Sequence, residues 1–524
     1  MFFSSRHRKQ ERCVRKTVGR RRLSVEALEN RRVLAGLVEV TFDIATQTLS
    51  LTGDVNSNDI EIRQDTSDPA DRFEIIARNG TRLSLPGLSG FTEAFSTAVS
   101  NVKDIDLFFD QGGADVIDLL APTSGGTSEL EGPLEIFTSG NNQVLMQNWE
   151  VETLTIGNTI DGRSEWTLEN VVVARDTFLN SFGGETFTKI SDSQLDGLVD
   201  IVNAVGDDDL QITDTRIGGG LVRPPEGPGY LPIALLIDNG DGRSITMMSS
   251  TNDLTGTVVH GDVDLVNGEG FDTVMLQGIE VKGGVTIANG DGDAAGGATV
   301  MIDQGTLIGT DGIDGGILTL TNGSRRDILM IDNAEIRNGM LVDNSAADTS
   351  GNDTRINNAR IGGNAFYGNV IQVVNGLGND SIVVDGGTTL MGFVDFGMDD
   401  GNDEVTIANT TILGVLNIGH NDFAATFTPE FLDEFPGLTE ADSSDGNGRD
   451  VVTLENTVVR DGTFIDLGAD ADELALLGST QLDTLGLLEG GSSFADLLRL
   501  SVLADIHQTM AGFEDTDFVA AVSS

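Results

Sequence analysis

The sequence predicts an all-β protein, a right-handed parallel β-helix (a solenoid) of about 12–14 coils of roughly 20–30 residues each. Three observations indicate this fold. Segments of alternating apolar and polar residues return along the chain, glycine-rich acidic turns separate them, and helical patterns do not intervene. A chain of 524 residues with 39% hydrophobic residues has enough apolar side chains for an ordered core. Stacked repeats account for this length better than about two to four globular domains would.

The repeating unit is clearest in the copies that begin at Asp327, Asp403 and Asp450. Each copy has an acidic turn, an Asp, an alternating strand, a turn that often holds Asn, and a second alternating strand. The anchors Asp327, Asp353, Asp380 and Asp403 are spaced by 26, 27 and 23 residues. Weaker anchors extend the pattern backwards: Asp115, Asn142, Glu165, Glu185, Asp209, Arg243, Asp272 and Ala298. In such coils we expect Val, Ile and Leu to point inward, and Thr, Asp, Asn and Arg to point outward.

Four regions follow from the pattern. Residues 1–36 are a basic leader, and residues 37–100 are an N-terminal β module or cap with strands at 38–44, 48–51, 60–63 and 73–77. Residues 101–485 are the coils, with insertions near 223–232 and 422–446. Residues 486–524 are a C-terminal cap and tail, in which Ser493 begins a helix that continues to His507.

The charge of the chain divides sharply between leader and body. Residues 1–32 hold eleven basic and three acidic residues, a formal charge of +8, whereas the remainder holds 20 basic and 80 acidic residues, or −60. Such a body repels nucleic acid, anionic lipid and polyuronate chains, and it attracts cations. A transmembrane segment is not expected, because the sequence has no apolar run of about 18 residues. The single cysteine, Cys13, excludes an intramolecular disulfide framework.

The end of the leader carries a family resemblance. The segment 28–35, Leu-Glu-Asn-Arg-Arg-Val-Leu-Ala, resembles the LEPR-XLL segment at the N-terminus of many large surface or secreted proteins of planctomycete bacteria. It departs from that motif at Asn30, where the family has Pro, and at Val33, where it has Leu. The resemblance implies export to the cell surface or the outside, through an N-terminal segment unlike a standard secretory signal. It implies no enzymatic activity.

The acidic turns resemble a second family, the calcium-binding RTX repeats. Turns such as Asp400-Gly401-Asn402-Asp403 are similar to the RTX nonapeptide, in which Asp carboxylates and turn carbonyls bind Ca²⁺. The motif returns about once per coil here, so Ca²⁺ is expected only between the turns of neighbouring coils. The candidate metal ligands are Asp115, Asp272, Asp353, Asp380, Asp400, Asp403 and Asp450. The alternative is that Asp, Asn and Gly are simply the residues that tight turns use.

Two classes of function remain. The first is an exported structural or adhesive surface protein that is not an enzyme, with divalent cations, extracellular polysaccharide or other surface proteins as partners. The second is a carbohydrate-active β-helix enzyme, a polysaccharide lyase or glycoside hydrolase, with paired carboxylates from a cluster such as Asp207, Asp208 and Asp209. Carboxylate pairs are weak evidence in a chain with 83 acidic residues, and His260 and His420 are interpreted as surface turn residues. The first class is favoured, without catalytic residues.

Overall fold

The computed structural model consists of two units, residues 1–34 and 35–524, and all the described strands belong to the second unit. The structure describes residues 36–519 except for 66–70, 122–125, 221–231, 252–255, 292–296, 311–315, 345–349, 364–368, 420–447, 484–485, 491–495, 502–504, 507–508, 512 and 514. The leader before Gly36, Cys13, the insertion near 422–446 and all of the Pro-rich insertion except Pro232 lie outside the described residues.

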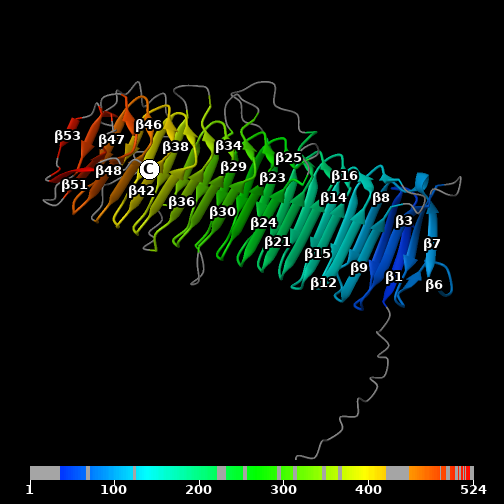
Figure 1. Cartoon of the computed structure of the whole chain (residues 1–524). Helices are drawn as coiled ribbons and strands as arrows, with labels where there is room; N and C mark the ends of the chain where they lie inside the picture. The colour runs from blue at the N-terminus through cyan, green and yellow to red at the C-terminus, as the bar shows by residue number, and fades with distance from the viewer. Residues whose placement is uncertain are drawn as a thin grey trace, which may run out of the picture. The chain divides into compact units, whose positions relative to one another are not determined.

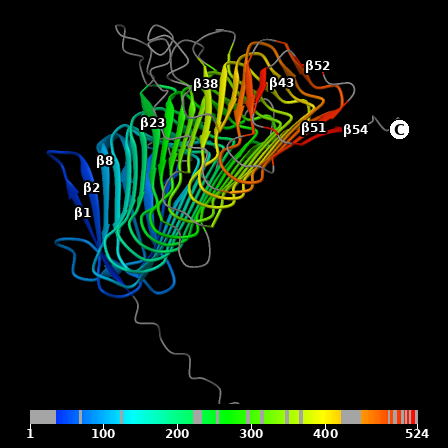
Figure 2. The same ribbon diagram turned by 90° about the vertical axis from the view of Figure 1, so that its left-hand side faces the viewer.

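The predicted solenoid is confirmed: the second unit is a parallel β-solenoid, and its described strands form 15 to 16 coils. Each coil contributes one strand to each of three sheets, here named A, B and C, and the next strand of the same sheet follows three strands later in the chain. Figure 1 shows the strands side by side along the stack, and Figure 2 shows the coils one behind another, from β1 and β2 to β51, β52 and β54.

Sheet A contributes continuous apolar columns to the core. Leu107, Ile136, Ile156, Leu179 and Ile201 face one another in register on successive coils, and all are fully buried. The coil strands of sheet A are β8 (Asp104–Phe109), β11 (Leu134–Thr138), β14 (Leu154–Asn158), β17 (Thr177–Ser181), β20 (Val199–Asn203), β23 (Ile233–Asp238), β26 (Asp262–Val266), β29 (Val285–Ala288), β32 (Leu318–Thr321), β35 (Met340–Asp343), β38 (Val370–Val374), β41 (Phe393–Gly397), β44 (Leu416–Ile418), β47 (Thr463–Asp466), β50 (Leu487–Glu489) and β53 (Thr509–Ala511).

Sheet B carries the alternating strand that defines the repeat. Every second residue of these strands is apolar and buried, such as Val300 and Ile302, and the residues between them face outward. Its coil strands are β9 (Ala114–Leu120), β12 (Asn141–Gln147), β15 (Ser164–Glu169), β18 (Thr186–Ser191), β21 (Asp208–Thr213), β24 (Ser244–Ser249), β27 (Thr273–Gln277), β30 (Thr299–Asp303), β33 (Ile328–Asp332), β36 (Asp353–Asn357), β39 (Ser381–Asp385), β42 (Glu404–Ala408), β45 (Val451–Glu455), β48 (Glu473–Leu477), β51 (Leu497–Ser501) and β54 (Asp515–Val519).

Sheet C consists of strands of two or three residues that follow sheet B after a short turn. They are β10 (Ser128–Leu130), β13 (Trp149–Val151), β16 (Val172–Val173), β19 (Gln194–Leu195), β22 (Arg216–Ile217), β25 (Val258–Val259), β28 (Glu280–Val281), β31 (Leu307–Ile308), β34 (Glu335–Ile336), β37 (Arg360–Ile361), β40 (Thr389–Leu390), β43 (Thr411–Ile412), β46 (Val458–Val459), β49 (Gln481–Leu482) and β52 (Asp505–Ile506).

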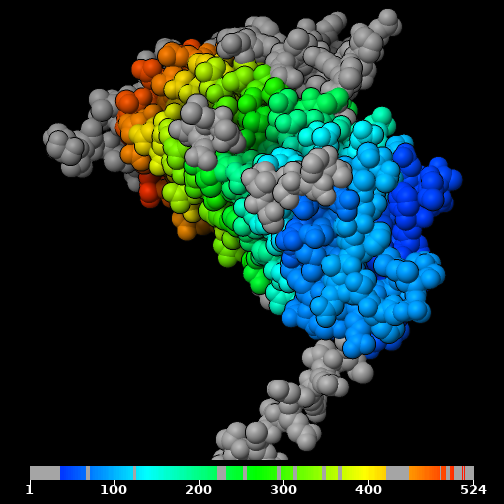
Figure 3. All heavy atoms as spheres, turned by 90° about the vertical axis from the view of Figure 1, so that its right-hand side faces the viewer, coloured from blue at the N-terminus to red at the C-terminus, as the bar shows by residue number. Residues whose placement is uncertain are grey.

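An antiparallel module covers the N-terminal end of the stack (Figure 3). It contains β1 (Leu37–Asp43), β2 (Thr48–Gly53), β3 (Asp59–Asp65), β4 (Arg72–Ala77), β5 (Arg82–Ser84), β6 (Phe91–Thr92), β7 (Ala94–Ala98) and the 3-10 helix η1 (Val99–Asn101). Strands β2 and β3 pair with β8 and β9 of the first coil. Phe73 stacks on Trp149 at 5.8 Å, and Arg78 Nη2 lies 2.5 Å from Asp118 Oδ2, so side chains also join the module to the coils.

The expected C-terminal helix is wrong within the described residues. Strand β51 (Leu497–Ser501) pairs in register with β48, and β52, β53 and β54 complete further turns of the solenoid. The apolar residues of this segment fit a helix but also fit an alternating strand, because Leu498 and Leu500 lie two residues apart. The unpaired edge of β48 offers backbone hydrogen bonds that a helix would leave unused, which favours the strand.

Candidate functional site

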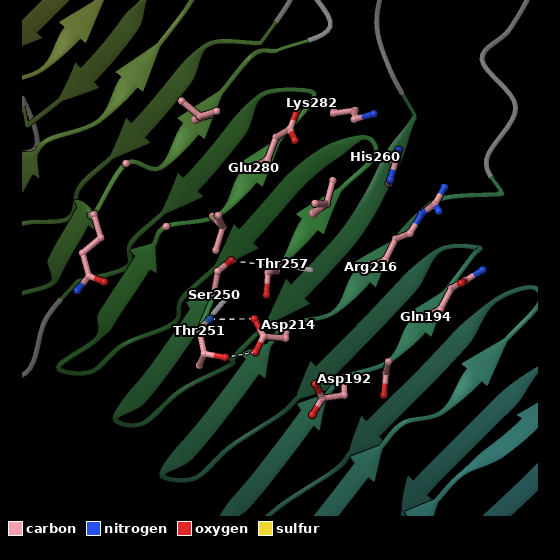
Figure 4. A pocket seen from close by; sticks show the side chains of 18 of the residues that line it. Asp192, Gln194, Asp214, Arg216, Ser250, Thr251, Thr257, His260, Glu280 and Lys282 are labelled. Carbon is pink, nitrogen blue, oxygen red and sulfur yellow. Dashed lines mark hydrogen bonds between the residues drawn. The ribbon is translucent and has the colours of Figure 1, made fainter. Parts of the chain in front are cut away.

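A groove of about 1130 Å³ runs along sheet C across six successive coils. Its floor is a column of residues that face one another in register: Val172, Gln194, Arg216, Val258, Glu280 and Leu307. Figure 4 shows polar side chains rising from this floor and from both sides of it. Strands of a sheet lie about 4.8 Å apart, so the floor is about 24 Å long.

One side of the groove is the corner between sheets B and C. The chain turns there through a residue in the left-handed region, with φ of 52° at Asn170, 51° at Asp192 and 48° at Asp214. Asn and Asp accept this conformation more readily than other residues with a side chain, which explains the Asn that the repeat shows at this turn. The corner therefore places a column of short polar side chains along the groove.

Two carboxylates stand on this side on consecutive coils. Asp192 and Asp214 both line the groove. Thr251 holds the second one, because its backbone N–H donates to Asp214 Oδ1 at 2.8 Å and its hydroxyl donates to Asp214 Oδ2 (Figure 4). Carboxylates in this position can accept hydrogen bonds from hydroxyl groups of a ligand.

Basic side chains gather on the opposite side of the groove. Figure 4 shows Arg216, His260 and Lys282 together there, away from Asp192 and Asp214. His260 and Lys282 follow strands that pair Val259 with Val281, so they belong to one column. Among the described residues, neither Arg216 nor Lys282 forms a salt bridge. Glu280 lies beside Lys282 on the same side, so Arg216, Lys282 and Glu280 together carry a formal charge of +1 there, on a body with a formal charge of −60.

Five of the seven predicted metal ligands lie inside the solenoid, at the corner between sheets A and B. Asp115, Asp272, Asp380, Asp403 and Asp450 are at most 3% exposed. In each, Oδ1 accepts the backbone N–H of the equivalent residue on the preceding coil, at 2.5–3.0 Å. The expectation that Asp side chains point outward is wrong for this column, since the carboxylate replaces a hydrogen-bond partner that the turn would otherwise lack.

Asp208 and Asp472 occupy the same interior position on other coils and extend this aspartate column. Among the described residues, the second carboxylate oxygen, Oδ2, is buried without a hydrogen bond in Asp115, Asp208, Asp403 and Asp472. Burial raises the pKa of Asp115 to about 6, and burial assisted by the carboxylates of Asp380 and Asp450 raises the pKa of Asp403 to about 8. Burial likewise raises the pKa of Asp208 and of Asp472 to about 7.

The glycines of the acidic turns have a steric cause. A Cβ atom at Gly184 would lie 1.9 Å from the carbonyl oxygen of Gly162, and one at Gly206 would lie 1.9 Å from that of Gly184. Gly242 and Gly270 repeat this contact on the next coils, at 2.0 and 1.8 Å. Only glycine permits such close stacking, so the turn composition is explained without a metal ion.

The remaining predicted residues do not join the column. Asp353 is on the outer face of β36 and forms a salt bridge with Arg326, while the column position on that coil belongs to Asn352. Asp400 is in an exposed turn. Of the proposed catalytic cluster, Asp208 belongs to the interior column and Asp209 is on the outer face of β21, so the cluster is not part of the groove.

The structure brings Asp380, Asp403 and Asp450 together on consecutive coils but does not assemble a Ca²⁺ ligand set. Ca²⁺ requires about six to eight oxygen ligands, and each of these carboxylates already uses one oxygen for a backbone N–H. In the part of the chain that is described, no group of three or more His, Cys, Asp or Glu side chains is placed to hold a metal ion. Calcium binding stays a prediction.

Two features are missed by reasoning from the sequence. The first is a buried ladder of seven asparagines, each side-chain N–H donating to Oδ1 of the next at 2.6–3.3 Å: Asn203, Asn239, Asn267, Asn289, Asn322, Asn344 and Asn375. Its signal is an Asn directly before the first Gly of many turns. The second is the groove, whose floor residues are separated by 22, 22, 42, 22 and 27 positions. This uneven spacing hides their alignment, and with it the place of His260.

Comparisons of the chain with protein-family models, with curated proteins and with solved structures found no match. The fold and the groove are therefore the basis for any statement about function. The described residues include no helix with the length and apolar character to cross a bilayer.

Proposed function

We propose that the protein is an exported structural and adhesive solenoid that binds a linear extracellular polysaccharide along the groove of sheet C. The observation that carries the proposal is the groove itself, which crosses six coils with polar side chains repeated at the strand spacing. A linear polymer with regular hydroxyl groups matches such a repeated surface. The LEPR-XLL-like leader supports export.

The two sides of the groove suggest how a sugar chain is held. The carboxylates of Asp192 and Asp214 would accept hydrogen bonds from hydroxyl groups, and Arg216 and Lys282 would bind carboxylate or sulfate groups. Arg216 and Lys282 are two coils apart, about 10 Å along the solenoid axis. The proposed ligand is accordingly an acidic polysaccharide with anionic groups on alternate sugars. The overall negative charge does not prevent this, because salt at physiological ionic strength screens charges beyond about 8 Å.

The experiment is affinity electrophoresis of the full chain through gels that contain neutral, carboxylated or sulfated polysaccharides. We expect retardation by an acidic polymer, and at least a tenfold weaker interaction for the double variant R216Q/K282Q. The matched control is K189Q/R355Q, which removes the same charge from the outer face of β18 and β36. Absence of retardation by every polymer would overturn the proposed function. Equal loss in both double variants would assign the binding to net charge instead of the groove.

A second candidate is a glycoside hydrolase or lyase that acts in the same groove. Its specific support is that Asp192 and Asp214 are one coil apart, about 4.8 Å in backbone spacing, which is close to the roughly 5–5.5 Å between the carboxyl groups of retaining glycosidases. Incubation with each polymer that binds, followed by a reducing-end assay, distinguishes the two. Product that forms with the wild type and not with D192N would favour the enzyme, and binding without product would favour the adhesive protein.

A further inference from the structure

Four methionines form a column on the outer face of sheet B. Met247 in β24, Met275 in β27, Met301 in β30 and Met330 in β33 face one another in register on four consecutive coils. Figure 1 labels β24 and β30, which lie two coils apart in this column. Their neighbours along each strand are buried, so alternation directs the four side chains away from the core.

The concentration of methionine in this column is specific. The chain has 11 methionines, of which Met1 lies outside the described residues. Five are buried in the solenoid: Met146, Met248, Met340, Met391 and Met398. Of the five that remain, four form the column and the fifth, Met510, is isolated on β53. A surface strand that needs only β propensity would use Val, Ile or Thr, so the shared property of these four residues is the thioether.

Thioether sulfur is a soft ligand, and among protein-bound metals it selects monovalent copper. A first-row metal–sulfur bond is about 2.3 Å long, so an ion between two sulfurs needs them about 4.6 Å apart. Adjacent strands of the sheet are about 4.8 Å apart, which matches this separation without a change in the backbone. The column therefore provides three positions, one between each adjacent pair, at which two thioethers can bind one ion.

The surroundings favour a cation. Asp303 and Asp332 lie two residues beyond Met301 and Met330 on the same outer face of their strands. Their carboxylates raise the local concentration of positive ions. Thr273 and Thr299, two residues before Met275 and Met301, keep the column open to solvent on its other side, since both are only partly buried.

From these observations we infer that the methionine column is a binding site for soft monovalent cations, Cu⁺ and its analogue Ag⁺. The site is independent of the proposed function, because it lies on sheet B and shares no residue with the groove. Hard cations such as Ca²⁺ and Mg²⁺ are not expected to bind there, since thioethers bind hard ions poorly.

The test uses Ag⁺, which is stable in air, and the full chain with Cys13→Ser, because a thiol would bind the same ions. The readout is NMR of ¹³C-methyl-labelled methionine, assigned by single Met→Leu variants. We expect Ag⁺ to shift the four column methyl signals and to leave those of Met248 and Met510 unchanged. M275L/M301L, which keeps the volume of both side chains nearly constant, is expected to weaken Ag⁺ binding at least tenfold, and M510L to have no effect.

Two results would overturn the inference. Absence of shifts at millimolar Ag⁺ would leave the column as an apolar contact surface, and equal shifts of all methionine signals would indicate unspecific binding. Circular dichroism of M275L/M301L shows whether the variant is folded, so loss of the site is distinguished from loss of the solenoid. Binding of Cu⁺, measured anaerobically against a colorimetric chelator, is expected to follow the same order of variants.

Discussion

The contribution of each interior aspartate to the stability of the folded state depends on whether its carboxyl group is protonated. Asp403 and Asp472 are buried at the corner of sheets A and B, and their neighbours in the column are the carboxylates of Asp380, Asp450 and Asp496. Further carboxylates, Asp399 and Asp470, approach from the turns. The pKa of Asp403 is raised to about 8 and that of Asp472 to about 7, so the folded state holds protons that the unfolded chain releases near pH 4.

The solenoid is therefore expected to be most stable in mild acid. Between about pH 4 and pH 8 the folded state binds more protons than the unfolded state, so the free energy of unfolding falls as the pH rises. Each such group contributes up to roughly 1.4 kcal/mol per pH unit within this window. Urea denaturation between pH 5 and pH 8 measures the slope. A stability that rises with pH would contradict the protonated column.

Asp403→Asn is the sharpest variant of this column. The chain itself places Asn352 at the equivalent position, where Oδ1 accepts the backbone N–H of Asp327 at 2.9 Å, so the amide fits. D403N is expected to raise the free energy of unfolding by about 1–3 kcal/mol at pH 8 and to change it little at pH 5. D353N, on the outer face, is the control. If Ca²⁺ instead stabilises the wild type at pH 8 and D403N abolishes that effect, the calcium prediction is supported.

Asp353 and Asn352 also show why the ligands could not be placed from the sequence. The sequence shows that aspartates repeat, but a shift of one residue in the alignment of two coils moves a side chain from one face of a strand to the other. Spacings that vary from 22 to 47 residues between coils leave that shift undetermined. Burial of Asp is unfavourable in general, so only the backbone N–H of the preceding coil, which the sequence does not show, explains the interior position.

At the scale of the elements, the turns are more predictable than the groove that they form. The Asn turn between two strands follows from local chemistry, because few other residues accept a positive φ. The groove depends on the register of six coils, and insertions of different length interrupt that register. The C-terminal helix failed for a related reason, since an apolar segment takes the structure that its neighbour can pair with.

Substitution of Asn333, whose φ is 51°, tests how strongly the turn between sheets B and C depends on its left-handed backbone conformation. Both N333G and N333V remove the side-chain amide that accepts a hydrogen bond from Asn358, so their difference reports the backbone alone. We expect N333V to be less stable than N333G by about 1–2 kcal/mol, because a β-branched side chain opposes a left-handed conformation. Urea denaturation compares the two proteins. Equal stability would mean that the turn accommodates Val by a change of backbone conformation.

At the largest scale, the second unit is a one-dimensional stack, in which each coil contacts mainly its two neighbours. In such a stack the cooperativity of unfolding depends on the interfaces between neighbouring coils, so a defect in a central coil separates the stack into two unfolding units. Ile302, fully buried in β30, lies in a central coil. I302D is expected to convert a single calorimetric transition into two, since a buried charge disrupts both interfaces of that coil.

The conservative variant I302V is the control for this prediction. It removes one buried methylene, which costs about 0.5–1.5 kcal/mol, and leaves the number of transitions unchanged. If I302D still unfolds in one step, the stack is coupled over more coils than nearest-neighbour contacts provide.

The N-terminal module has a consequence for how the chain reaches this structure. Its strands β2 and β3 present a completed edge to β8 and β9, and each later coil pairs with one that precedes it by 18–47 residues. Every coil can thus form on a template that is already in place, with a modest cost of loop closure. Folding would advance in one direction along the chain, so the N-terminal coils would be structured while the C-terminal part of the chain was still unfolded.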